Sequence, residues 1–530
     1  SGSNVNGSVN EMYTNYYKLV SSTTLSYDKE FAGKHNVSAL VGWEAEENKT
    51  DFMRSSGTNL ATDALQTVTT AGTYTANAYY WGHTMLSMLS RAEYSYDGRY
   101  YISGSFRRDG SSRLGENSRW GNFWSVAGSW RVTNEEFMKN ITQISNLRLR
   151  GSYGVNGTLP SANYGWRALA SYNSKYMDAP GGVIANIADA NLAWETSYTW
   201  NAALEVGLFN NRLNATVEYF NRDSKDLLQS VPISTVTGFS STLRNIGEIN
   251  NHGVEIELSG DIIRTNDLTW SAGITGSWIK STVTKLYGGD DIVWYDPYAG
   301  DSRAKFIYRE GESTLAYYGI EWAGVERETG RNVWFLNDED ATADLTVDGR
   351  PATYSYAKAN EVILGEAHPK FFGGFSTDLT WKGLSVGLTF TYKIGGYTYN
   401  APGRDINDDG YYWERIMSQF CYDNRWTPEN KDAKYPQRIA IDMEDVNQKS
   451  SRHMNPADYV RLKNITVAYT LPRSLTSKVH IQNARIYFNG ANLWTWAAHK
   501  EYDPEVGHWG SRGWEMPIGK TYTFGLEFSF

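Results

Sequence analysis

The stretch TYTFGLEFSF, Thr521–Phe530, decides the fold. Aromatic and apolar side chains occupy every second position, beginning with Tyr522 and ending with Phe530, and small or polar side chains lie between them. Successive side chains of a β-strand point to opposite faces, so this stretch predicts a strand with one apolar and one polar face. The apolar face can pack on a second sheet in a soluble protein, or it can meet lipid in a membrane β-barrel.

The same alternation recurs along the chain, and its recurrence favours the barrel. Further examples are Leu213–Tyr219, Val254–Ser259, Leu268–Trp278 and Leu384–Lys393. Charged residues also occur within these alternating stretches, for example Glu255 and Glu257. The water-filled lumen of a barrel accommodates such charges, whereas an unpaired charge in a dry sandwich core is costly. The sequence therefore predicts an all-β fold, a transmembrane antiparallel β-barrel.

The connections between the expected strands alternate in length. Short turns are expected at Asp97-Gly98, Phe209–Asn211, Arg264–Asp267 and Trp381–Gly383, and long loops at Asn48–His83, Leu159–Ala193, Ser281–Arg303 and Asn400–Ala457. Short periplasmic turns and long extracellular loops are typical of an outer-membrane barrel. Two longer links on the short side are expected to be a brief helix opened by a Thr-x-x-Glu capping box, Thr133–Ser145, and a turn containing Pro472, Leu471–Lys478.

The strand count suggests a longer protein. Assigning every short turn to one side gives about fifteen strands by the alternation rule, or about seventeen if Phe306–Val325 spans twice. With an odd count the first and last strands run in the same direction, which a closed antiparallel barrel of even strand number does not allow. The opening SGSNVNGSVN also has no Met and no signal-peptide pattern. We therefore expect further strands before residue 1.

Composition excludes several classes of function. A net charge of −9 argues against a nucleic-acid partner, and no apolar run is long enough for a membrane-spanning helix. Cys421 is the single cysteine, so no internal disulfide can form, and we expect it to be a packed thiol. The sequence carries no nucleophile elbow, phosphate loop or zinc-protease pair, and its 8 histidines are scattered. It predicts a protein that is not an enzyme and has no cofactor.

The long loops carry clusters of aromatic residues, which are the candidates for substrate binding. Aromatic faces stack on sugar rings, although the same rings can simply pack the loops together or face a partner. The candidates are Tyr164, Trp166, Trp294, Tyr298, Tyr411, Tyr412, Trp413 and Trp509. Tryptophans at the expected strand ends, such as Trp120, Trp124, Trp270 and Trp278, are more typical of the aromatic girdles at the membrane surfaces.

One acidic segment resembles the start of a calcium loop. DINDDG, Asp405–Gly410, offers Asp405, Asn407 and Asp409 as candidate metal ligands. The twelfth position, where a calcium loop has its bidentate Glu, is Ile416. The alternative is a solvated acidic turn with no bound metal.

Several stretches, in the same order, resemble the barrel of SusC/RagA-type TonB-dependent transporters from the outer membrane of Bacteroidetes. They are SFRRDGSSRLGENSRWGNFWSVAGSWRVTNEEF (Ser105–Phe137), LRLRGSYGVNG (Leu147–Gly157), NIGEINNHGVEIEL (Asn245–Leu258), YYGIEWAGVERETG (Tyr317–Gly330), HPKFFGGF (His368–Phe375), RWTPEN (Arg425–Asn430), DYVRLKNITVAYTLP (Asp458–Pro472), ANLWTW (Ala491–Trp496) and YDPEVG (Tyr502–Gly507). Tyr522, Phe528 and the terminal Phe530 also resemble the assembly signal of bacterial outer-membrane barrels.

The resemblance implies that residues 1–530 form the later two-thirds of a barrel of about 22 strands, without the plug domain and the first strands. It implies an active importer of oligosaccharides or peptides in the outer membrane. Its partners would be a SusD-like surface lipoprotein, TonB acting through the plug region, and outer-membrane lipid. The alternative is a barrel without active uptake, either a passive porin or an anchor for adhesive loops.

Overall fold

The computed structural model describes residues 6–62, 64–177, 179–296, 304–338, 341–411, 416–440, 446–505 and 510–530. Contacts divide the chain into two compact units. Unit 1 comprises Ser1–Glu136, Leu149–Ala202 and Arg222–Glu248, and unit 2 comprises Phe137–Arg148, Ala203–Asn221 and Ile249–Phe530.

Strands dominate, and among the described residues the largest sheet has 15 of them in chain order. They are β1 (Ser8–Phe31), β2 (His35–Leu60), β3 (Ala71–Tyr96), β4 (Tyr100–Ser111), β5 (Trp120–Arg131), β6 (Ile144–Thr158), β9 (Glu195–Leu208), β10 (Leu213–Pro232), β11 (Ser241–Arg264), β12 (Leu268–Lys285), β21 (Phe371–Trp381), β22 (Leu384–Ile394), β25 (Tyr459–Thr470), β26 (Asn483–Ala497) and β28 (Thr521–Ser529). The all-β fold and the count of about fifteen strands are confirmed. The higher count is wrong because Phe306–Val325 contributes short strands to other sheets.

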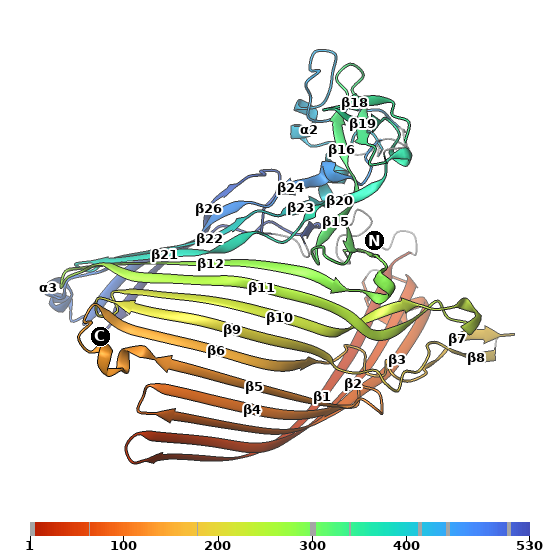
Figure 1. Cartoon of the computed structure of the whole chain (residues 1–530). Coiled ribbons are helices and arrows are strands. Elements are labelled where there is room, and N and C mark those ends of the chain that lie inside the picture. Colours follow the sequence, from red (N-terminus) through yellow and green to blue (C-terminus); the bar gives the residue numbers. More distant parts are fainter. Residues whose placement is uncertain are drawn as a thin grey trace. The chain divides into compact units, whose positions relative to one another are not determined.

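In unit 1 the strands β1–β5 pair in antiparallel hairpins and lie side by side (Figure 1). The β2–β3 ladder runs without a break from His35↔Tyr96 to Thr58↔Thr73. The predicted loop Asn48–His83 is therefore wrong, since only Ala61–Thr70 connects the two strands. The alternation of apolar and polar residues ends near Asn48, but backbone hydrogen bonds continue the ladder through Asn48–Leu60. Strand pairing is made by backbone groups and does not require an apolar face.

The excursion Leu159–Ala193 is a long loop, as expected. It carries the hairpin of β7 (Ala170–Tyr176) and β8 (Ala179–Ile184). At its base Leu114, Phe123, Val155 and Trp194 form a buried cluster in unit 1. Leu159, the first residue of the loop, packs against this cluster and so anchors the loop where it leaves the sheet.

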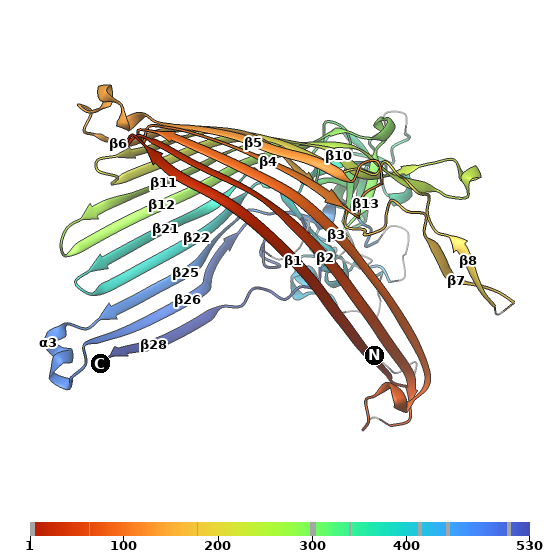
Figure 2. The same ribbon diagram turned by 90° about the horizontal axis from the view of Figure 1, so that it is seen from below.

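All four short turns predicted from the sequence are confirmed, and three of them contain residues in the left-handed conformation. Asp97 and Gly98 have φ of 52° and 63°, the values of a primed hairpin turn. Lys382 and Gly383, between β21 and β22, also have positive φ. Figure 2 shows the corresponding turns at the ends of successive hairpins.

The two longer links on the short side differ from expectation in detail. Thr133–Ser145 contains two 3₁₀ turns, Val132–Asn134 and Glu136–Met138, and the N-cap of the first is Arg131 rather than Thr133. The predicted capping box is therefore wrong. Leu471–Lys478, predicted as a turn, contains the short helix α3 (Arg473–Thr476), with Pro472 as its N-cap residue.

In unit 2 the long connections fold into small sheets of their own, which together we call the loop subdomain (Figure 1). One sheet contains β13 (Ile292–Tyr295), β14 (Lys305–Tyr308), β15 (Ala316–Ile320) and β20 (Glu361–Glu366), a second contains β16 (Trp322–Val325), β17 (Asn332–Phe335), β19 (Arg350–Thr353) and β18 (Leu345–Val347), and a third contains β24 (Met454–Pro456), β23 (Tyr397–Asn400) and β27 (Ser511–Arg512). Helices α1 (Ala401–Ile406) and α2 (Gln419–Asp423) complete it. The predicted loop Ser281–Arg303 is too short, since β12 continues to Lys285 and β21 begins only at Phe371.

The loop subdomain has a conventional core. Phe306, Tyr317 and Ala304 are fully buried together, and Val333 and Ala352 form a second cluster. Burial of this apolar area stabilises the subdomain, so it is a folded body rather than a set of separate loops.

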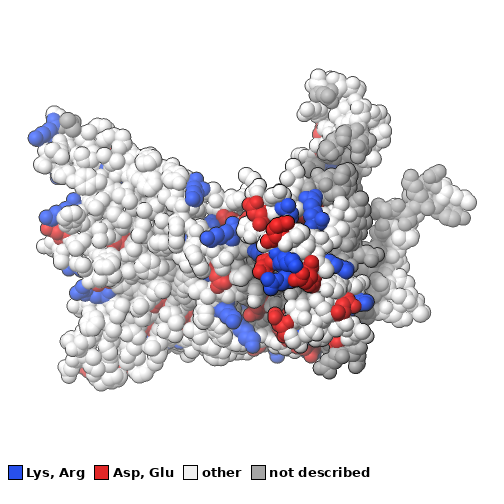
Figure 3. Space-filling model, turned by 90° about the horizontal axis from the view of Figure 1, so that it is seen from above, with Lys and Arg blue, Asp and Glu red and all other residues white. Residues whose placement is uncertain are grey.

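The strands of the main sheet expose apolar side chains instead of burying them. Phe524, Leu526 and Phe528 of β28 are each more than half exposed, and Ile256 and Ile274 are also exposed. A soluble sheet would cover such a face, so this exposure matches contact with lipid. On the face in Figure 3 acidic and basic side chains gather in the middle of the view, beside a largely uncharged surface. Among the described residues, no helix has the length and apolar character to cross a membrane.

Candidate functional site

Two of the candidate aromatic residues are packing residues of unit 1. Trp166 is 8 % exposed, donates its indole N–H to the carbonyl oxygen of Ser112 at 3.0 Å, and stacks with Arg119 and Arg167. The hydroxyl of Tyr164 accepts a hydrogen bond from the backbone N–H of Gly82 at 3.0 Å. Both rings tie the Leu159–Ala193 loop to neighbouring strands, so the packing alternative describes them better than ligand stacking.

The candidates in unit 2 are divided between the core of the loop subdomain and its surface. Trp294 stacks on Phe306 with ring centroids 4.6 Å apart, beside the larger buried cluster. Tyr411 is half-buried, and its backbone N–H bonds the carboxylate of Asp408 at 3.2 Å. Tyr298, Tyr412, Trp413 and Trp509 lie outside the described residues.

The DINDDG segment is a buried junction, and the solvated-turn interpretation is wrong. Asp409 is 2 % exposed and its carboxylate accepts hydrogen bonds at 2.8 Å from both Arg452 and Asn332. The amide of Asn407 donates to Glu501 at 3.0 Å and accepts from the Ser418 hydroxyl at 2.5 Å. The segment thereby joins β17, α2 and the chain after β26.

These hydrogen bonds occupy most of the side-chain atoms that could bind a metal ion. Asn407 and Asp409, two of the three candidate ligands, already bond to protein groups, and a bound cation would compete with the Arg452 guanidinium for Asp409. Within the described ranges no group of three His, Cys, Asp or Glu side chains is placed to hold a metal ion. Asp405 is half-buried at the end of α1.

Glu501 connects this junction to the rest of the loop subdomain. Burial disfavours its charge, but contacts from His499 and a 2.8 Å hydrogen bond from the Tyr435 hydroxyl outweigh that effect and hold the pKa of Glu501 at about 2. Cys421 lies nearby and is buried, as the sequence predicted, and burial raises the pKa of its thiol to about 11. A thiol in this state is a packing group rather than a nucleophile.

We expect the junction to loosen in acid through Glu501. Its folded-state pKa of about 2 lies below the ordinary value of 4.5, so the carboxylate contributes stability above pH 4.5 that is lost as the pH falls towards 2. The full contribution is on the order of 3 kcal/mol. The protection factors of amide hydrogens in the loop subdomain, that is, the intrinsic exchange rate at each pH divided by the observed rate, should fall between pH 5 and about pH 2.5.

The matched variants are Glu501→Gln and Glu328→Gln. Glu328 forms an exposed ion pair with Lys431, so its replacement should leave the acid dependence unchanged. Glu501→Gln should exchange faster at pH 5 and change less on acidification. If protection against hydrogen exchange changes equally with pH in Glu501→Gln and in the unmodified protein, the role of this carboxylate is contradicted.

A second buried charge cluster lies at the start of β25. Arg461 is 2 % exposed and bonds the carboxylates of Asp503 at 2.5 Å and Glu505 at 2.9 Å. Lys463 and the Tyr459 hydroxyl also reach Glu505, at 3.0 Å and 3.1 Å. The cluster ties β25 to the segment after β26. Sequence reasoning missed it, although its members belong to two of the stretches quoted above, DYVRLKNITVAYTLP and YDPEVG.

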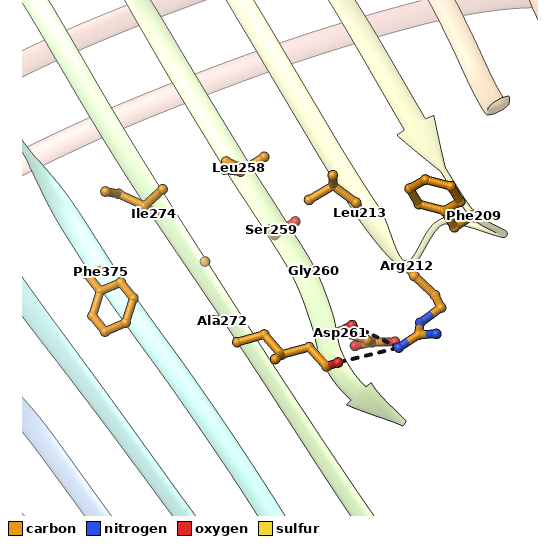
Figure 4. A pocket seen from close by; sticks show the side chains of 12 residues that line it. Phe209, Arg212, Leu213, Leu258, Ser259, Gly260, Asp261, Ala272, Ile274 and Phe375 are labelled. Carbon is orange, nitrogen blue, oxygen red and sulfur yellow. Dashed lines mark hydrogen bonds between the residues drawn. The ribbon is translucent and has the colours of Figure 1, made fainter. Parts of the chain in front are cut away.

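An apolar depression of about 500 Å³ lies on the face of the main sheet in unit 2 (Figure 4). Leu213, Leu258, Ile274 and Phe375 line it from four strands. At its edge Arg212 donates to backbone carbonyl oxygens of β11 at 3.4 and 3.5 Å. Its lining is the same exposed apolar face, so it is a hollow in the lipid-contacting surface.

Comparison with known proteins is consistent with this geometry. Residues 1–493 match the family described as TonB dependent receptor-like, beta-barrel. The chain belongs to this family. TonB-dependent receptor P3 of Formosa agariphila is 30% identical over 559 aligned residues, covering 100% of this chain and 54% of that protein. TonB-dependent receptor SusC of Bacteroides thetaiotaomicron is 26% identical over 86% of this chain and 44% of its own length.

The fold agreement with a solved member of the family is close. The structure of the RagAB peptide transporter matches 98% of this chain and 56% of its own chain, with a TM-score of 0.85 and 30% identity. The chain therefore has the TonB-dependent receptor barrel fold, and it is a SusC- and RagA-like protein of the outer membrane. It spans about half the length of the curated relatives it matches.

Proposed function

We propose that the chain forms the wall of an active importer, with a plug domain and earlier strands supplied by residues outside 1–530. The supporting observation is the 30% identity to the RagAB peptide transporter across 98% of the chain, loop subdomain included. The wall separates two rims, and the loop subdomain on one rim offers surface for substrate and for a partner. The protein binds and passes its substrate and carries out no bond chemistry.

The proposed partners follow from the same similarity. A SusD-like surface lipoprotein would cover the loop subdomain, and TonB would act through the plug. The substrate would be an oligosaccharide or a peptide. The buried Asp409–Arg452 pair would hold the parts of the loop subdomain together, and the Arg461 cluster would fix the segment after β26 to β25 of the wall.

Energy-dependent uptake tests this function. In cells that carry the complete protein, accumulation of labelled oligosaccharides or peptides should require TonB and stop when an uncoupler collapses the proton gradient. A general porin in the same cells is the control, since its passive flux should continue. Uptake that persists without TonB would instead support the passive-porin alternative.

The C-terminal strand is proposed as the assembly signal. Tyr522 and Phe528 share one exposed face of β28, and Phe530, which directly follows the strand, is 80% exposed. Phe530→Ala should reduce the folded, heat-modifiable protein in the outer membrane severalfold, because it removes the terminal aromatic group that ends the apolar face.

Ser529→Ala is the matched control for this prediction. Ser529 lies on the opposite face of the strand and pairs through its backbone with Asn483, which an alanine preserves. Its assembled amount should stay near that of the unmodified protein. Equal amounts of folded protein for the two variants would refute the role of Phe530.

A further inference from the structure

The apolar depression in Figure 4 begins at the rim of the short turns and extends inward along the wall. Leu213 is the first residue of β10, and Ile262 lies two residues before the end of β11, so the depression reaches the turn end of both strands. Farther in it is lined by Leu258, Ile274 and Phe375, whose side chains are exposed. It therefore runs from the level of the turns into the apolar part of the lipid-contacting surface.

The depression is a concave part of a face that is otherwise covered by large side chains. Gly260 alternates with Leu258 and Ile262 on β11, and Ala272 precedes Ile274 on the same face of β12. The volume of about 500 Å³ lies within the range of about 300–1,000 Å³ that pockets for small molecules have. The wall thus offers room for part of one lipid molecule at this place.

Apolar character alone does not retain a particular lipid. Lipid chains are as apolar as leucine side chains, so an apolar surface inside a bilayer gains no hydrophobic free energy from contact with them. Retention of one lipid requires a closer fit, which adds dispersion contacts, or a protein group that binds the headgroup. A concave surface provides the closer fit because it contacts a chain on more than one side.

The rim of the depression provides a group for the headgroup. Arg212 donates two side-chain hydrogen bonds, both from Nη2 to backbone carbonyl oxygens of β11, and it forms no ion pair with any described residue. The lining also contains Asp261, but its carboxylate pairs with Arg264 at 3.4 Å. In the neighbouring turns Lys382 and Asp267 balance each other at 3.8 Å. The rim therefore keeps one uncompensated positive charge, and a guanidinium binds phosphate through parallel N–H groups.

We propose that the depression binds one phospholipid of the periplasmic leaflet, with an acyl chain along Leu258 and Ile274 and the phosphate at Arg212. Short turns of outer-membrane barrels face the periplasm, and the leaflet on that side consists of phospholipids. The bound lipid holds this part of the rim at the level of the headgroups. The inference rests on the position of the barrel in the membrane and is independent of active import.

Two substitutions test the two parts of the site separately. Ala272→Phe should fill the depression, and Arg212→Gln should remove the phosphate contact while the apolar lining stays intact. The control for added bulk is Val217→Phe, at an exposed position of β10 outside the lining. The control for lost charge is Lys382→Gln, which removes a cation of the same rim that does not line the depression.

The measurement is native mass spectrometry on the complete protein in detergent. The protein is titrated separately with phosphatidylglycerol, phosphatidylethanolamine and a diacylglycerol of the same chains. The unmodified protein should retain one phospholipid more than Ala272→Phe. Arg212→Gln should need severalfold more phospholipid for the same occupancy, with no change for diacylglycerol. Both controls should match the unmodified protein, at equal folded content by heat modifiability.

Several results would overturn the proposal. One is equal phospholipid retention in the unmodified protein and Ala272→Phe. Another is an unchanged phospholipid affinity in Arg212→Gln, or diacylglycerol binding as tightly as the phospholipids, because the phosphate contact would then be absent. A protein dimer that is lost in Ala272→Phe would assign the depression to a second copy of the chain. Isolated lipid A retained in preference to phospholipids, and lost in Ala272→Phe, would assign it to the opposite leaflet.

Discussion

Arg461→Met should destabilise the protein by about 3–5 kcal/mol, because it removes the cation bonded to both Asp503 and Glu505: Asp503 loses its cation, and Glu505 keeps only Lys463. Methionine keeps much of the side-chain volume, so the loss comes from charge rather than from a cavity. The change should appear as a lower temperature of heat modification for the purified protein. Because Arg461 lies near the start of β25, we also expect less assembled protein in the membrane.

An exposed ion pair on the next strand supplies the control. Arg485 and Glu527 lie 3.2 Å apart with 38% and 56% of their side chains exposed. Arg485→Met should cost only about 0–1 kcal/mol, because solvent screens such pairs. Adding Asp503→Asn and Glu505→Gln to Arg461→Met should restore part of the lost free energy of unfolding, because it removes the two negative charges. Equal effects for Arg461→Met and Arg485→Met would contradict the buried cluster.

Gly410→Ala is expected to displace the DINDDG segment while leaving the main sheet intact. Gly410 has φ of +120°, and an added Cβ would lie 2.0 Å from the carbonyl oxygen of Ile439, so the backbone must move. That movement breaks the neighbouring Asp409–Arg452 pair, which is buried on both sides. We expect uptake to fall strongly at a normal amount of assembled barrel.

Gly349→Ala separates steric displacement from backbone strain. Gly349 also has positive φ, at +79°, but nothing lies within 4 Å of an added Cβ. Its replacement should cost only the strain of about 1 kcal/mol and leave uptake unchanged. Uptake should be compared at equal amounts of surface-labelled protein. Normal uptake in Gly410→Ala would mean that the junction does not support the binding surface.

The wall of the protein could be predicted from the sequence because alternation and turn residues are local signals. Asp97-Gly98 and Trp381–Gly383 mark turns by their backbone chemistry, and the strands between such turns follow from period-two patterns. Asn48–Leu60 could not be recognised, since its pairing with β3 continues through polar residues. The length of a ladder depends on the partner strand, which the local pattern does not contain.

The loop subdomain and the junctions depend on contacts between distant residues. Asp409 looked like a metal ligand because its partners, Asn332 and Arg452, are far away in sequence. Trp166 looked like a sugar-stacking residue for the same reason, since its packing against Arg119 cannot be read from the loop alone. The Arg461 cluster joins segments about 40 residues apart, and only the fold brings them together.

Sidedness is the central claim, because import requires that the strands cross the outer membrane with the loop subdomain outside the cell. The two ends of β11 test it. Val236, in the turn before β11, is 95% exposed, and Asn266, in the turn after it, is also exposed. In a Cys421→Ser background, Val236→Cys should label with an impermeant maleimide on intact cells, and Asn266→Cys should label only after the outer membrane is opened. Labelling of Asn266→Cys but not Val236→Cys on intact cells would invert the topology and contradict the account.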